Sequence, residues 1–287
     1  MTTPHPAPPL TRRQLRAVQQ HGRAGRDLPV AIGVGVAMAA VVLASLFIRK
    51  EAFVVVVAAA VCASLWELTQ ALAKRSIVVP IVPVAVGSVG MVVAAYAAGG
   101  QALAVCFLLT CVGVALWRSA DGPEGALQDL AGGIFAAAYL PLLAGFTTLM
   151  LAADDGPRRV VTYVLVTVAS DIGGYAAGVL TGRHPMAPSV SPKKSWEGFA
   201  GSVLACILVG SLSVWLLLDG PWWAGALLGL AAALVSTLGD LGESMLKRDL
   251  GIKDMGSILP GHGGVMDRLD SLLLSAPVCF LLLHLLV

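Results

Sequence analysis

Charged residues are scarce in this chain of 287 residues, where Asp, Glu, Lys and Arg together make up 13%. Soluble domains average about 25% charged and about 45–50% apolar residues, whereas 57% of this sequence is hydrophobic. A water-soluble fold is therefore excluded. The two charge signs also nearly cancel, and a formal net charge of +2 is too small to favour nucleic-acid binding through bulk electrostatics.

Cysteine is rare as well, and none of the five cysteines belongs to a Cys-x-x-Cys pair. All of them lie within apolar stretches, which is typical of small buried hydrophobic residues rather than of disulfides or zinc ligands. They are Cys62, Cys106, Cys111, Cys206 and Cys279. We assign no chemistry to them.

Long apolar runs, by contrast, fill most of the chain. A helix needs about 20 apolar residues to cross a bilayer, and nine segments approach that length: 29–48, 52–71, 77–97, 101–117, 130–151, 160–181, 199–218, 221–242 and 267–286. The first segment has no charged residue and no clear small-residue cleavage site after it, so we expect a retained span rather than a signal peptide. The sequence predicts an all-α polytopic membrane protein with about nine transmembrane helices.

Lysine and arginine are shared unevenly among the segments between these helices. With the N-terminus inside, the inner segments hold 15 of the 19 Lys and Arg residues, and the outer loops hold 4. The positive-inside rule then predicts a cytoplasmic N-terminus. We divide the chain into a basic cytoplasmic tail at 1–28, N-terminal helices at 29–151 and a C-terminal catalytic domain at 152–287. The long loops 182–198 and 243–266 of that last domain should face the cytoplasm and carry the chemistry.

Besides the acids of the last two predicted spans, two acids lie inside spans, where a charge is costly. A charged side chain at the centre of a span costs at least about 2.5–3.5 kcal/mol, so each is a candidate for function. Asp171 lies about halfway along 160–181, and the glycines after it allow close helix approach; a helix–helix hydrogen bond is the alternative role. Glu67 is the misplaced acid of the N-terminal half, and we assign no function to it.

Acidic residues also gather at the facing ends of the last two predicted helices. Asp240, Glu243 and Lys247 are spaced three and four apart and share one helical face. Asp267 and Asp270, three apart, likewise share a face. Two such ends could hold Mg²⁺, which takes one or two carboxylates and completes its shell with waters and phosphate oxygens. Alternatively the charges mark helix ends at the interface, which is an equal possibility for Glu243 and Asp270.

The segment between these ends combines cations with four glycines between positions 256 and 264. Glycine-rich backbone offers N–H groups to an anion, while Lys247, Arg248, Lys253 and Arg268 could neutralise phosphate charge. The spacing is not that of a Walker P-loop and no strand precedes it, which excludes the soluble NTPases. His262 lacks a second His or Cys that would favour zinc, so we expect it to contact a phosphate or order the loop.

The other long loop reads SVSPKKSWEG from 189 to 198. Its two lysines, Lys193 and Lys194, lie beside the hydroxyls of Ser191 and Ser195. Lysines alone would satisfy the positive-inside rule, whereas the hydroxyls and Trp196 suggest a further role for this loop.

The stretch from Ser244 to Asp270 resembles the signature of the phosphatidate cytidylyltransferase (CDP-diacylglycerol synthase) family. It reads SMLKRDLGIKDMGSILPGHGGVMDRLD and departs from the family pattern at no fixed position. The Gly-Asp-Leu run at 239–241 and the SPKKSWEG loop also look like the family, with Ser195 where threonine is frequent. Asp171 is similar to the acidic motif on the family's preceding helix. The resemblance covers about residues 165–271, and the N-terminal half matches only in being apolar.

The resemblance implies that CMP is transferred from CTP to phosphatidate, giving CDP-diacylglycerol and pyrophosphate, in a bacterial inner membrane. It implies Mg²⁺ on Asp240 and Asp267, with a second cation such as K⁺ left open. Lys247, Arg248 and Lys253 would neutralise phosphates during catalysis. The residues expected at the substrates are Lys193, Lys194, Ser191, Asp171, His262, Gly263, Gly264 and Arg268.

Other functions remain open on the residues alone. A CTP-dependent polyprenol or lipid kinase would transfer the γ-phosphoryl group and need a base. A secondary transporter could use Asp171 and the glycine-broken helices as an ion path. The Asp-Gly-x-x-Ala-Arg motif of CDP-alcohol phosphotransferases is absent from the sequence. Small-residue pairs such as Gly33-x-Gly35 and Gly87-x-x-Gly90 could pack helices within one chain or in a homodimer.

Overall fold

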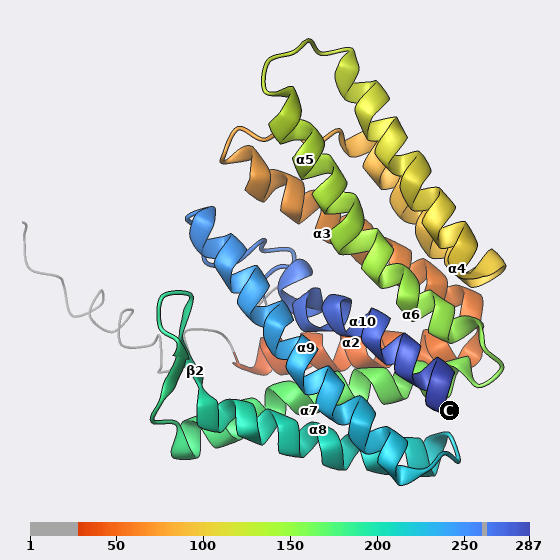
Figure 1. Cartoon of the computed structure of the whole chain (residues 1–287), viewed down its shortest axis with the longest axis vertical. Coiled ribbons are helices and arrows are strands. Elements are labelled where there is room, and N and C mark those ends of the chain that lie inside the picture. The colour runs from red at the N-terminus through yellow and green to blue at the C-terminus, as the bar shows by residue number, and fades with distance from the viewer. Residues whose placement is uncertain (1–27, 260–262) are drawn as a thin grey trace, which may run out of the picture.

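A computed structural model describes residues 28–259 and 263–287, with side chains described from residue 33 onward (Figure 1). The described chain is almost entirely helical, which confirms the predicted all-α class. Its elements in order are α2 (Leu28–Ile48), α3 (Lys50–Ala73), α4 (Ile81–Ser119), α5 (Ala126–Ala137), the π-helical turn η1 (Ala138–Leu142), α6 (Leu143–Ala152), α7 (Gly156–Thr181), β1 (Pro185–Ala187), β2 (Ser191–Ser195), α8 (Trp196–Leu217), α9 (Trp222–Asp249) and α10 (Met266–Leu286).

Seven helices in the described part of the chain are long and apolar enough to cross a membrane, so the chain is a multi-pass membrane protein. The predicted number of nine is not supported by this count. The expected spans 77–97 and 101–117 both fall within α4, and the described apolar part of α2, Gly33–Ile48, is shorter than a full span. The tail at 1–27 lies outside the described residues.

Gly99 interrupts α4, because its φ of 82° and ψ of −170° are not helical. Glycine adopts this conformation readily, since it has no Cβ to clash. Gly87 packs directly on the side chain of Thr110, and a Cβ on Gly113 would lie 3.4 Å from Pro83. These two pairings run in opposite directions along the chain, so the halves of α4 fold back on each other. Gly87 thus allows the two halves of α4 in the same chain to pack closely.

A buried ion pair fixes the loop that joins α4 to α5. Arg118 Nε donates to Asp129 Oδ2 at 2.7 Å, and both side chains are less than 10% exposed. Asp129 also accepts the backbone N–H of Val78 at 2.6 Å, and Arg118 donates to the carbonyls of Gly122 and Glu124. These bonds satisfy two buried charges that would otherwise be costly.

Glycines bring α7, α8 and α9 into direct backbone contact. A Cβ on Gly201 of α8 would lie 2.6 Å from the carbonyl oxygen of Gly173 on α7. Gly225 and Gly229 of α9 pack with the same closeness against the backbone of α8. Small residues at such crossings let helices approach without side chains between them, and this close packing positions the polar ends of the three helices.

The expected loop 182–198 contains an antiparallel hairpin of β1 and β2, in which Pro185 pairs with Ser195. Helix α8 begins directly after it, and the Ser195 hydroxyl accepts the Gly198 N–H at 3.1 Å as a helix cap. The expected loop 243–266 is shorter than its predicted bounds, because α9 continues to Asp249. Figure 1 shows the hairpin extending beyond α7 and α8, near α9.

Candidate active site

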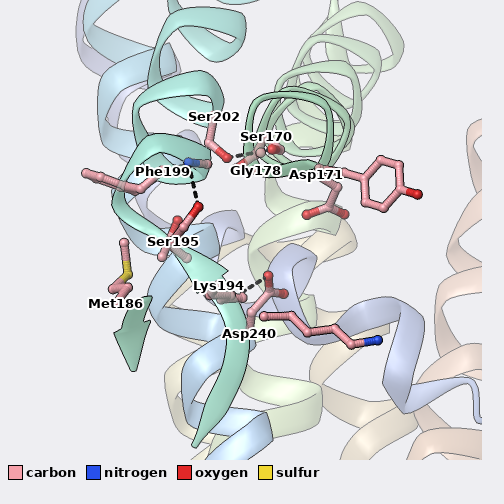
Figure 2. A pocket seen from close by; sticks show the side chains of 14 residues that line it. Ser170, Asp171, Gly178, Met186, Lys194, Ser195, Phe199, Ser202 and Asp240 are labelled. Atoms are coloured by element: carbon pink, nitrogen blue, oxygen red, sulfur yellow. Dashed lines mark hydrogen bonds and ion pairs between the residues drawn. The ribbon is translucent and has the colours of Figure 1, made fainter. Parts of the chain in front are cut away.

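A cavity of about 260 Å³ lies between α7, the β-hairpin, α8 and α9. Its wall includes four of the polar residues expected from the sequence: Asp171, Lys193, Lys194 and Asp240. The hydroxyls of Ser170, Ser202 and Thr237 come from the helices around it (Figure 2). Residues from the 182–198 segment, α7 and α9 therefore reach one cavity.

An ion pair between Lys194 and Asp240 joins the hairpin to α9. The Lys194 ammonium lies 2.7 Å from Asp240 Oδ2, and each side chain is 27% exposed. The other carboxylate oxygen, Oδ1, accepts the hydroxyl of Ser271 on α10. Figure 2 shows the Lys194–Asp240 contact at the edge of the cavity, opposite the Ser170–Ser202 hydrogen bond. The Asp240 carboxylate on α9 thus contacts side chains from β2 and α10. We call Lys194, Asp240 and Ser271 the cavity cluster.

Asp171 reaches the same cavity from α7, with an exposed side chain. It lies within electrostatic range of Asp240 and Asp270, and the cations Lys194 and Arg268 lie within the same range. Because both acids and cations lie near this space, a phosphate or a metal ion entering it would find opposite charge. Asp171 thus faces the cavity, as a residue expected at the substrate should.

Asp267 is the centre of a second group, at the start of α10. Its carboxylate lies 2.6 Å from the Lys247 ammonium and accepts the N–H groups of Met255 at 3.1 Å and Gly264 at 2.7 Å. Lys247 also lies 2.8 Å from Glu243, which is only 2% exposed. Glu243, Lys247, Asp267 and these two amides form what we call the loop cluster. Both clusters draw on α9 and α10, since Asp240 and Glu243 are one helical turn apart.

The remaining cations expected from the sequence are more exposed. Arg248 donates from Nε to the carbonyl of Val190 in the hairpin at 3.3 Å. This contact brings the end of α9 against the β1–β2 turn. Lys253 is exposed in the segment after α9, and Arg268 is exposed in the first turn of α10. Of these three cations, Arg268 lies within electrostatic range of the Asp171 carboxylate.

The other residues expected at the substrates lie either in the hairpin or beside the loop cluster. Ser191 begins β2 and pairs with Ala187, whereas Gly263 and Gly264 belong with the loop cluster. Gly263 has a φ of +89°, and a Cβ there would lie 3.0 Å from Asp267 Oδ2, so a side chain would crowd the carboxylate. His262 lies outside the described residues.

Magnesium fits the chemistry of these carboxylates, although no cage of protein ligands encloses it. In the described part of the chain, no three His, Cys, Asp or Glu side chains are placed to hold one ion. Mg²⁺ does not require such a cage, because it uses one or two carboxylates together with waters and substrate phosphates. Asp240 and Asp267 each pair with a lysine ammonium, so each carboxylate already has a cationic partner.

Sequence reasoning assigned no role to two residues that the fold brings to the clusters. Ser271 was unremarkable because a hydroxyl in a helix is common, and only packing places it on Asp240. Glu67 of α3 stands out in the sequence as an acid in an apolar run. In the structure it accepts the N–H of Met266 at 2.9 Å, although the two residues are 199 positions apart in the chain. A charge in an apolar run was the available signal, but its partner was not visible in the sequence.

Comparisons with known proteins identify the family of the whole chain. A model of the Cytidylyltransferase family matches residues 29–286. The phosphatidate cytidylyltransferase of Mycobacterium bovis is 40% identical over 277 residues, covering 92% of this chain and 90% of the relative. That of Mycobacterium leprae is 39% identical over 295 residues, covering 97% and 95%. That of Helicobacter pylori is 45% identical over 144 residues, about half of each chain. The chain therefore belongs to the phosphatidate cytidylyltransferase family.

Proposed function

We propose that this protein transfers CMP from CTP to phosphatidate and releases pyrophosphate, forming CDP-diacylglycerol for phospholipid synthesis. The membership of the family supports this reaction over nearly the whole chain. The structural observation that carries it is the Lys194–Asp240 contact in a polar cavity between apolar helices. A lipid phosphate stays near the membrane surface while CTP arrives from water, so the reaction needs a charged site at the ends of spans.

Both substrates are anions, and the main task of the protein is to neutralise and align them. An oxygen of the phosphatidate phosphate forms a bond to the α-phosphorus of CTP. The bond from that phosphorus to the bridging oxygen breaks, and pyrophosphate leaves with the electron pair. Phosphatidate is already ionised near neutral pH, so no side chain has to act as a strong base. A kinase acting on a lipid hydroxyl would need one.

The lysines of the two clusters divide this work in the proposal. Lys193 and Lys194 bind substrate phosphates in the cavity, with Ser191 and Asp171 beside them. Lys247, Arg248 and Lys253 neutralise the phosphates on the other side, where Gly263 and Gly264 offer backbone N–H groups and Arg268 assists. His262 contacts a phosphate or orders its loop. Each lysine that pairs with an aspartate would contact a phosphate as well when substrate binds.

Asp240 and Asp267 are the acids that would hold Mg²⁺, and K⁺ is a candidate for a second cation between them. Bound Mg²⁺ would supply Lewis-acid stabilisation of the charge on the leaving pyrophosphate. The protein's own residues contribute the placement. Ser271 orients the Asp240 carboxylate, and two backbone amides orient that of Asp267. The site would face the cytoplasm, in keeping with the asymmetry of Lys and Arg along the sequence.

Transfer of α-labelled CTP tests the reaction directly. Purified protein in detergent is given the labelled CTP, phosphatidate and Mg²⁺, and the lipid is extracted and separated by thin-layer chromatography. We expect the label to enter the lipid with equal release of pyrophosphate, because CMP stays on the lipid only in this reaction. A γ-label entering the lipid instead would identify a kinase. Solute flux into liposomes without CTP would identify a transporter, and either result would overturn the proposal.

A further inference from the structure

Glu67 of α3 is a buried acid far in sequence from the proposed active site. Its side chain is only 3% exposed, and it lies within a candidate membrane span. Its Oε2 atom accepts the N–H of Met266 at 2.9 Å, whereas Oε1 has no hydrogen-bond partner among the described residues. A buried carboxylate without full partners is costly, and such a group in a native fold calls for an explanation.

The backbone of the segment before α10 passes directly over this carboxylate. A Cβ on Gly256 would overlap Glu67 Oε1, and a Cβ on Gly264 would lie 2.6 Å from Oε2. Only glycine at both positions lets the chain approach so closely. Gly256 and Gly264 are also adjacent to each other, since the same Cβ on Gly264 would lie 2.8 Å from the Gly256 nitrogen. Glu67 thus packs against Gly256 and Gly264 where these two parts of the segment lie side by side.

Asp267 holds the same segment from its other end. The amides of Met255, which precedes Gly256, and of Gly264 itself donate to the Asp267 carboxylate. Met266, which donates to Glu67, directly precedes Asp267 in the chain. A shift of the Glu67 carboxylate would therefore move the amides that orient Asp267. Asp267 in turn pairs with Lys247 at 2.6 Å.

We propose that Glu67 is a positioning residue for cytidylyl transfer, which fixes the backbone at 255–259 and 263–266 and through it Asp267 and Lys247. The inference rests on the proposed function, and it gives the N-terminal helices a part in the active site. Glu67 touches neither reactant in this arrangement. It acts by presenting a carboxylate oxygen to the Met266 N–H and by packing against Gly256 and Gly264.

The test compares three variants of the full chain in detergent: Glu67→Ala, Glu67→Gln and, as a matched control, Glu51→Gln in the exposed first turn of the same helix. Loss of a group that orients a catalytic residue typically costs about 10- to 100-fold. We expect Glu67→Ala to lower kcat by that factor with little change in the KM for phosphatidate. Glu67→Gln should recover most of the loss, because its amide oxygen can still accept from Met266. The control should match the wild type.

Hydrogen exchange by mass spectrometry gives a readout that does not depend on activity. We expect peptides covering 252–268 to exchange faster in Glu67→Ala than in the wild type, with Glu67→Gln intermediate and Glu51→Gln unchanged. Unchanged exchange, an unchanged kcat of the folded protein, or a Gln variant as impaired as the Ala variant would each overturn the inference. A wild type that fails to transfer CMP would instead refute the proposed function.

Discussion

The contact between Lys194 and Asp240 yields the most direct prediction about catalysis. We would replace each residue alone, as Lys194→Met and Asp240→Asn, and then both together. Removing one group that stabilises charge in a transition state typically costs about 100- to 1,000-fold in kcat. We expect each single variant to lose activity in that range, since both side chains line the cavity.

The double variant measures whether the two residues act as one unit. Their atoms are 2.7 Å apart and each side chain is 27% exposed, so a charge-assisted hydrogen bond of about 1.5–3 kcal/mol is appropriate. At 1.36 kcal/mol for each factor of ten, this equals a coupling of about 10- to 150-fold. The double variant should therefore be about 10- to 150-fold more active than the product of the two single losses predicts.

The assay is CMP transfer to phosphatidate under saturating CTP, normalised to monodisperse protein from size-exclusion chromatography. Arg49→Met, at an exposed cation between α2 and α3, controls for loss of positive charge in general. Losses that simply multiply in the double variant would refute the reasoning, because they would mean that the ion pair has no part in the reaction. Single variants with wild-type activity would remove the cavity cluster from the site.

Three further predictions concern the metal and the framework. Chelation should abolish CMP transfer and added Mg²⁺ restore it, with Asp240→Asn requiring more Mg²⁺ than the wild type; equal Mg²⁺ curves would argue against this ligand. Arg118→Met should destabilise the protein by about 3–5 kcal/mol, because it strands the buried Asp129, whereas adding Asp129→Leu should recover much of the thermal midpoint in detergent. Gly229→Val should prevent α9 from packing on the Cys206 backbone and lower that midpoint sharply, and an unchanged midpoint would contradict the close crossing.

The chemistry-bearing residues of the C-terminal half could be identified from the sequence because they are local. A span of apolar residues interrupted by Asp171, and helix ends bearing Asp240 and Asp267, stand out because charge in a bilayer is costly. Their spacing also places Asp240 and Lys247 on one helical face. In the structure, Lys194 and Asp171 line one cavity with Asp240. The assignment of Mg²⁺ to the two aspartates stays a prediction.

The break within α4 shows what hydropathy reports and what it leaves out. Hydropathy separates 77–97 from 101–117, and α4 turns at Gly99, between these two runs, so that its halves pack against each other. Hydropathy contains no information on the backbone angle that makes this turn. It also does not give the end of α9, which continues past the apolar run to Asp249.

Composition and local spacing alone determined that this chain is a helical membrane protein and that its polar residues gather in two C-terminal segments. These properties depend on the cost of burying charge and on the period of a helix, which act over short stretches of chain. Only the tertiary structure decided that Lys194 pairs with Asp240 and that Glu67 lies beneath Gly256 and Gly264. Contacts between residues 46 or 199 positions apart depend on how whole helices pack.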